Sequence, residues 1–119
     1  MSNMNDSLDT LMKIDGAVAV AVVDSTSGML LGFRGQGLDI EIAAAGNTEV
    51  VRAKMTTMKN LGLKDEIEDI LISLSKQYHI IRPCSKKEGL FIYIVLDRSR
   101  SNLALARRMV LDVEGAFVL

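Results

Sequence analysis

Residues Ala17–Asp24 form a run that has no polar side chain before Asp24. A β-strand with one face in water would alternate apolar and polar residues, so this run predicts a strand that is buried on both faces. Residues 90–96 are equally apolar and are rich in β-branched and aromatic side chains. We therefore expect the two runs to lie in the middle of one sheet, with helices covering both of its faces.

Two segments before residue 65 have the periodicity of amphipathic helices. The first extends from Met4 to about Lys13. The second is long, because Asp39 is placed to cap its first turn and Gly62 to end it, which predicts a helix over residues 39–61. The predicted apolar stripe of this long helix consists of Ile42, Ala43, Val50, Ala53, Thr57 and Leu61, flanked by Val51, Met55 and Met58.

The remaining elements complete an α+β chain of one domain over residues 1–119. Residues 29–34 are the expected hairpin partner of the first strand, and residues 67–73 and Gln77–Pro83 precede the last strand in a meander. Ser99 or Ser101 is expected to cap a final helix. The apolar stripe of that helix consists of Leu103, Ala106, Val110 and Val113. The order of elements predicts a three-layer sandwich on one antiparallel sheet.

The composition excludes several classes of protein. A net charge of -1 and a pI near 5.8 argue against a nucleic-acid-binding surface. No apolar run is long enough to span a bilayer. One cysteine cannot form an internal disulfide, and seven methionines without a signal peptide fit a reducing cytoplasm. We expect a cytoplasmic protein whose partner is another protein.

Residues able to carry chemistry are few. His79 is the only histidine, and we expect it on a sheet face with a backbone or water partner. Cys84 follows Pro83, and the nearby Lys86 and Lys87 could lower the pKa of its thiol if it is exposed. An enzyme that uses Cys84 and His79 is one alternative, although no third group is evident to orient them. No catalytic residue, metal ligand or cofactor is predicted.

Charged residues gather in two places. Residues 65–69 contain four acids and are expected to form a solvated loop. The basic residues Arg98, Arg100, Arg107 and Arg108 surround the start of the last helix. They form either a charged helix face or a docking patch for an acidic protein surface.

The landmarks of this order resemble the roadblock/dynein light chain family. The resemblance covers nearly the whole chain. It is carried by residues 11–24 with Gly28-Met29-Leu30-Leu31, residues 38–45, Ile70-Leu71-Ile72, residues 78–83, residues 90–97 and Ser101-Asn102-Leu103-Ala104.

The resemblance implies a profilin-like fold in which the five strands are ordered second, first, fifth, fourth, third. It places the long helix on one face of the sheet and the other two helices on the opposite face. It also implies a non-enzymatic, dimeric regulator or scaffold that binds a Ras-like small GTPase or a related signalling complex. A small-ligand sensory domain of profilin-like or PAS-like architecture, with its cavity between sheet and helix, is the alternative.

The resemblance further implies a homodimer built by the third strand and the long helix. The residues agree, because an apolar edge strand over residues 67–74 would invite aggregation unless a second copy paired with it. The predicted interface residues are Gly46, Val50, Met55, Met58, Ile67, Ile70, Ile72 and Leu74.

Overall fold

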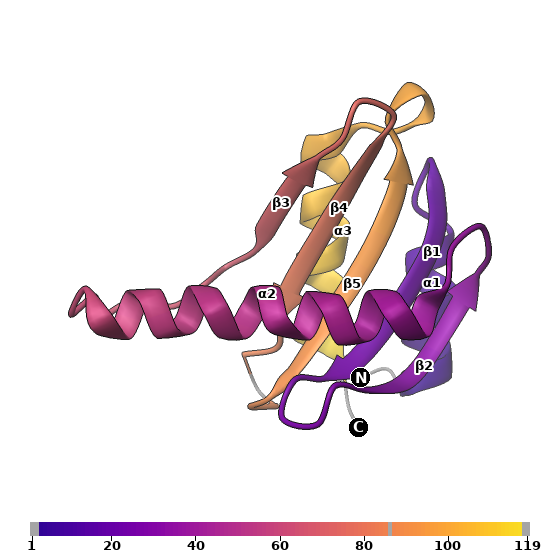
Figure 1. The fold of residues 1–119 in the computed structure, drawn as a ribbon. Helices are drawn as coiled ribbons and strands as arrows, with labels where there is room; N and C mark the ends of the chain where they lie inside the picture. The colour runs from indigo at the N-terminus through magenta and orange to yellow at the C-terminus, as the bar shows by residue number, and fades with distance from the viewer. Residues whose placement is uncertain (1–2, 86, 118–119) are drawn as a thin grey trace.

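The computed structural model describes residues 3–85 and 87–117, and Figure 1 shows their arrangement. The elements are α1 (Met4–Met12), β1 (Ala17–Asp24), β2 (Met29–Gly35), α2 (Ile40–Asn60), β3 (Ile70–Ser73), β4 (Gln77–Pro83), β5 (Leu90–Asp97), the 3₁₀ turn η1 (Arg98–Arg100) and α3 (Leu103–Ala116).

The five strands form one antiparallel sheet in the order β2-β1-β5-β4-β3. The two apolar strands β1 and β5 pair along their length, from Ala17 opposite Leu96 to Asp24 opposite Leu90. Their position between β2 and β4 is the one that their lack of polar residues predicts. The α+β class, the strand order and the central pair are therefore confirmed.

Helices cover both faces of the sheet (Figure 1). Consecutive residues of β1 point to opposite faces, so Val20 and Val22 pack with α1 and α3 whereas Ala21 and Val23 pack with α2. Each face of β1 and β5 thus contacts a different core, which explains why neither strand alternates. None of the helices in the described ranges is both long and apolar enough to cross a membrane.

The third strand is shorter than predicted. It begins at Ile70, and residues 63–69 have no regular structure. Pro83 lies at the end of β4 where pairing would have to continue, and it has no N–H to donate. In addition, Arg82 Nη1 donates to the Glu68 carbonyl oxygen at 2.6 Å, so a side chain occupies an acceptor that the sheet would otherwise use.

The predicted cap of the last helix is wrong. Asn102 caps α3, because its side-chain oxygen accepts from Leu105 N at 3.0 Å. Ser99 and Ser101 instead bind to Asp97: Ser99 N donates to the Asp97 carboxylate, and Ser101 Oγ donates to the Asp97 carbonyl oxygen. The turn η1 therefore uses both serines before the helix begins.

The ends of α2 are confirmed but its apolar stripe is wrong. Asp39 caps the helix, and Leu63 N bonds to Met58 O at 2.9 Å in the turn at Gly62. The buried residues are Ala44, Thr48 and Val51, whereas predicted members such as Ile42 and Leu61 are exposed. Small side chains let the first half of α2 lie close to the sheet, and the second half continues past β3 (Figure 1).

Candidate functional site

The second half of α2 is a helix with little beneath it. From Arg52 to Asn60 every residue is exposed except Met58, which is half-buried. The large apolar side chains Met55, Leu61 and Leu63 are 58%, 66% and 53% exposed. We call residues 52–63 the α2 overhang. Water around so many apolar side chains is costly, so this segment is suited to contact with another protein.

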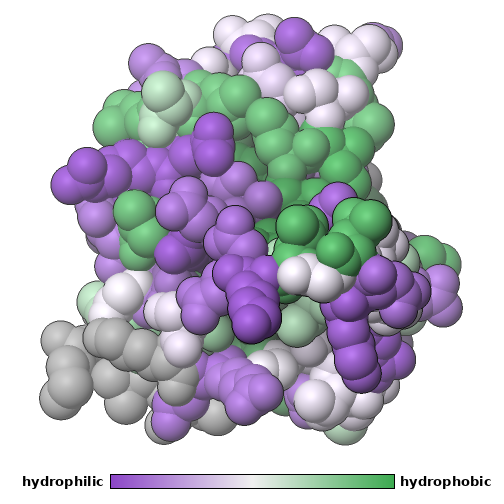
Figure 2. All heavy atoms as spheres, turned by 90° about the vertical axis from the view of Figure 1, so that its left-hand side faces the viewer, coloured by the Kyte–Doolittle hydropathy of each residue, from purple (hydrophilic) through white to green (hydrophobic). Residues whose placement is uncertain are grey.

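The edge strand β3 lies on the same side of the molecule as the α2 overhang (Figure 1). Leu71 and Leu74 are exposed, while Ile70 and Ile72 are half-buried on the α2 side of the sheet. One edge of β3 pairs with β4, and among the described residues no strand lies beside the other edge. Figure 2 views this side and shows hydrophobic surface, in green, gathered between hydrophilic residues, in purple.

The predicted interface residues are distributed over these two features. Met55 and Leu74 are exposed, and Met58, Ile67, Ile70 and Ile72 are half-buried. Gly46 is exposed, and a Cβ added there would meet nothing within 4 Å. Val50 is also half-buried and, like Ile70, packs against the core beneath α2. The free surface therefore belongs to the α2 overhang and β3.

A polar cluster lies on the α2 side of the sheet beside β3. Tyr93 Oη is 2.8 Å from His79 Nδ1, and His79 Nε2 is 3.0 Å from Gln77 Oε1. The arrangement fits a neutral imidazole that donates from Nε2 and accepts at Nδ1. The expected backbone or water partner of His79 is thus replaced by two side chains, which no sequence spacing reveals because Tyr93 comes from a different strand.

Burial shifts the pKa values of the two titratable side chains in this cluster. It lowers the pKa of His79 and raises the pKa of Tyr93, although a hydrogen bond from Asn47 on α2 acts in the opposite direction on the tyrosine. A neutral histidine and a neutral phenol are therefore favoured at physiological pH.

We expect His79 to make the folded chain less stable in mild acid. Its folded pKa lies below the ordinary 6.5, so between the two values the unfolded chain binds more protons. The free energy of unfolding should consequently fall as the pH is lowered through about 6.5. Because the chain has one histidine, an NMR titration reports this group alone. A folded pKa at or above 6.5 would contradict the role given to burial.

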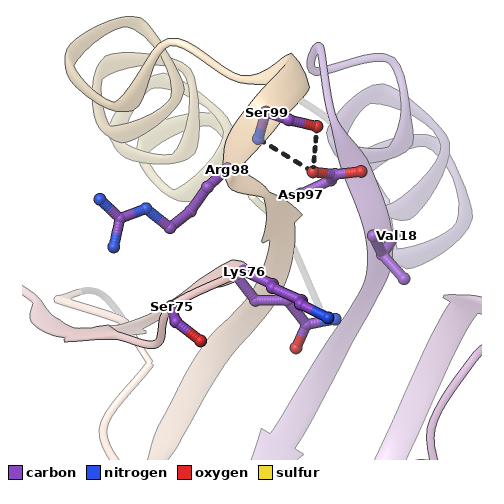
Figure 3. Close-up of a pocket in the computed structure, with 7 residues that line it drawn as sticks. Val18, Ser75, Lys76, Asp97, Arg98 and Ser99 are labelled. Atoms are coloured by element: carbon purple, nitrogen blue, oxygen red, sulfur yellow. Dashed lines mark hydrogen bonds between the residues drawn. The ribbon is translucent and has the colours of Figure 1, made fainter.

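An open pocket of about 600 Å³ lies at the end of the sheet, where β3 turns into β4 and β5 runs into η1. It is lined by Val18, Ser75, Lys76, Gln77, Asp97, Arg98 and Ser99. Figure 3 shows Lys76 extending across the pocket towards Val18, whereas Arg98 points away from Asp97. No α2 residue lines it, so it differs from the cavity between sheet and helix that a sensory domain would use.

The charges around this pocket have different partners. Asp97 accepts from Ser99 N at 2.9 Å and Ser99 Oγ at 2.7 Å, and these hydrogen bonds lower the pKa of its carboxyl group. Arg98 lies 4.7 Å above the Tyr78 ring centroid and donates to the Leu74 carbonyl oxygen. Within residues 3–85 and 87–117, neither Lys76 nor Arg98 has a carboxylate partner.

The structure contradicts a catalytic pair of Cys84 and His79. Cys84 is buried in the core beneath α1 and α3, on the opposite face of the sheet from His79. Burial, assisted by the negative charge of Glu114, raises the pKa of its thiol to about 12. The lowering that nearby lysines could cause in an exposed thiol therefore does not apply to this buried one. Lys86 lies outside the described residues. Within the described ranges, no group of His, Cys, Asp or Glu side chains could hold a metal ion.

Solved structures share this fold. A Roadblock/LC7 domain from Streptomyces avermitilis superposes with a TM-score of 0.82 at 10% identity, covering 97% of this chain and 94% of its own. Myxococcus xanthus MglB gives 0.82 at 21% identity, with 93% and 88% covered. A structure described as MglB with tetrameric arrangement gives 0.82 at 14% identity, with 94% and 82% covered. No protein-family model matches the sequence, and no curated protein matches it significantly.

Proposed function

Because this chain has the fold of Roadblock/LC7 domains, we propose that it is a non-enzymatic, homodimeric regulator or scaffold that acts in the cytoplasm. Its proposed partner is a Ras-like small GTPase or a related signalling complex. The single observation that carries the proposal is the free apolar surface of β3 and the α2 overhang, in a fold shared over almost the whole chain.

The edge of the sheet supports the proposed homodimer. β3 has unpaired backbone groups on its outer side and apolar side chains along it, and none of its four residues is a charge or a proline that would discourage pairing. A two-fold axis beside β3 would join two sheets and place each α2 overhang over the other copy. The eight predicted interface residues are all exposed or half-buried, so each keeps free surface for this contact.

We expect Ile72→Lys to convert the dimer to a monomer. Ile72 is half-buried on the α2 side of β3, so the substitution places a charge in the middle of the proposed contact. Light scattering measures the mass. Leu111→Lys, at an exposed leucine on α3 away from β3, is the control for the added charge and should remain dimeric. An Ile72→Lys protein that is still dimeric would exclude this interface.

The GTPase partner is tested by nucleotide dependence. A regulator acts on a GTPase only through unequal affinity for its nucleotide states. Tagged protein incubated with cell lysate containing GDP or a non-hydrolysable GTP analogue should retain a small GTPase in one state more than in the other, identified by mass spectrometry. Retention of no GTPase, or equal retention in both states, would remove the regulatory proposal while leaving the dimer intact.

A further inference from the structure

Two sets of charged residues that lack an ion-pair partner within the described ranges lie at opposite ends of the β3 region. Asp65 and Glu66 follow the α2 overhang; both are exposed, and neither has a cationic partner within the described ranges. Lys76 and Arg98 at the pocket are also exposed and lack a carboxylate. The later acid Asp69 differs, because Arg107 Nε binds its carboxylate at 2.8 Å.

We propose that the pocket at the end of the sheet is the docking site for residues 61–66 of a second copy of this chain. Leu61 and Leu63 would cover its apolar lining, and Asp65 and Glu66 would face Lys76 and Arg98. This inference rests on the proposed homodimer and names the contact that specifies it.

The topology brings these groups together. In one copy, Val50 and Ile70 pack against the core beneath α2, so the helix passes β3 near its Ile70 end. In an antiparallel pair of β3 strands, the Ile70 end of one copy lies beside the Ser73 end of the other. The second copy's α2 overhang therefore arrives near Ser73 and Gln77, at the mouth of the pocket.

The sheet surface near the mouth of the pocket is only partly covered by the chain's own residues. On the α2 side, Ile72, His79 and Gln77 are half-buried rather than buried, whereas Ile81, further along β4, is fully buried. The overhang supplies Leu61 and Leu63, which are among the most exposed apolar side chains of the chain. In the proposed dimer, the exposed leucines of one copy would therefore lie over the half-buried sheet surface of the other copy. The charged residues that lack ion-pair partners would lie beside this apolar contact.

The symmetry of the dimer gives a sharp test. Because the contact is isologous, each substitution acts twice in a homodimer. Lys76→Glu would oppose Glu66 with a like charge, and Glu66→Lys would oppose Lys76. Each variant should raise the dissociation constant of its homodimer by about tenfold. Equal amounts of the two variants should form a heterodimer in which both contacts again join opposite charges.

Native mass spectrometry with one variant labelled by ¹⁵N measures the distribution of dimers. We expect the heterodimer to exceed its statistical share, and the excess to decline at high salt because exposed charges are screened. The combined variant Lys76→Glu with Glu66→Lys should self-associate like the original chain. Lys13→Glu mixed with Glu66→Lys is the control and should show no such preference, because Lys13 lies at the end of α1.

Two outcomes separate this inference from the proposed function. Statistical mixing in a chain that is dimeric by light scattering would overturn the docking contact and leave the dimer standing. A monomeric original chain would overturn both.

Discussion

Gly35→Ala is expected to lower the free energy of unfolding by about 3 kcal/mol or more. Gly35 has a φ of +95°, a region that side chains rarely adopt. A Cβ built there would stand 2.7 Å from Ala19 Cα and closer still to the Val18 carbonyl oxygen. Both are backbone atoms of the paired strand β1, so relief requires β1 and β2 to separate. Urea unfolding followed by circular dichroism measures the change.

The same substitution at Gly46 is the control. Gly46 lies inside α2 and a Cβ there has open space, so Gly46→Ala should stabilise the chain by about 1 kcal/mol through helix propensity. Equal stability of the two variants would show that the close approach at Gly35 is absent in solution.

Glu114→Ala should cost about 3 to 5 kcal/mol, because it leaves a largely buried arginine without its counter-charge. Glu114 on α3 is 2% exposed, and its Oε1 lies 3.1 Å from Nη2 of Arg82 on β4, which is 15% exposed. Ser85 Oγ also donates to this carboxylate. Arg82 in turn holds the Glu68 carbonyl oxygen, so the substitution should loosen residues 63–69 as well.

The exposed pair Arg108 and Asp112 on the same helix provides the comparison. Their side chains are 72% and 64% exposed at 3.4 Å, so Asp112→Ala should change the free energy of unfolding by less than about 1 kcal/mol. Chemical denaturation of both variants measures the difference. Similar losses would mean that the burial of Glu114 does not determine its contribution.

The sequence predicts most where a local rule operates. Ala17–Asp24 and residues 90–96 lack polar positions because each strand packs against a hydrophobic core on both faces. This pattern can be recognised in each strand's own sequence, without knowing which elements pack against it. Asp39 and Gly62 mark the ends of α2 for the same reason: a cap acts within a few residues. The strand order, by contrast, came with the family resemblance, since antiparallel strands of this length allow other arrangements.

The predictions that are wrong fail because a residue's local structural preference is overridden by contacts with other parts of the fold. Ser99 and Ser101 are good caps, but Asp97 binds both first. The predicted third strand includes residues 67–69, yet Pro83 and Arg82, which come from elsewhere in the chain, oppose pairing there. The stripe of α2 was misplaced because periodicity assumes support along the whole helix. The pocket and the contact of Tyr93 with His79 join residues from different elements, so spacing could not reveal them.

The α2 overhang also has a consequence for the energetics of a lone copy. Buried contacts anchor α2 at Ala44, Thr48 and Val51, whereas the nine residues from Arg52 to Asn60 contain no buried residue. Arg52 Nη2 donates to the Thr26 carbonyl oxygen at the start of this segment, and the rest depends mainly on helical hydrogen bonds. A peptide of that length has marginal helicity in water. The amide hydrogens of this segment should exchange quickly in dilute solution, where the chain is monomeric, and more slowly at higher protein concentration, where the proposed dimer forms. The order of this segment would then depend on the protein concentration.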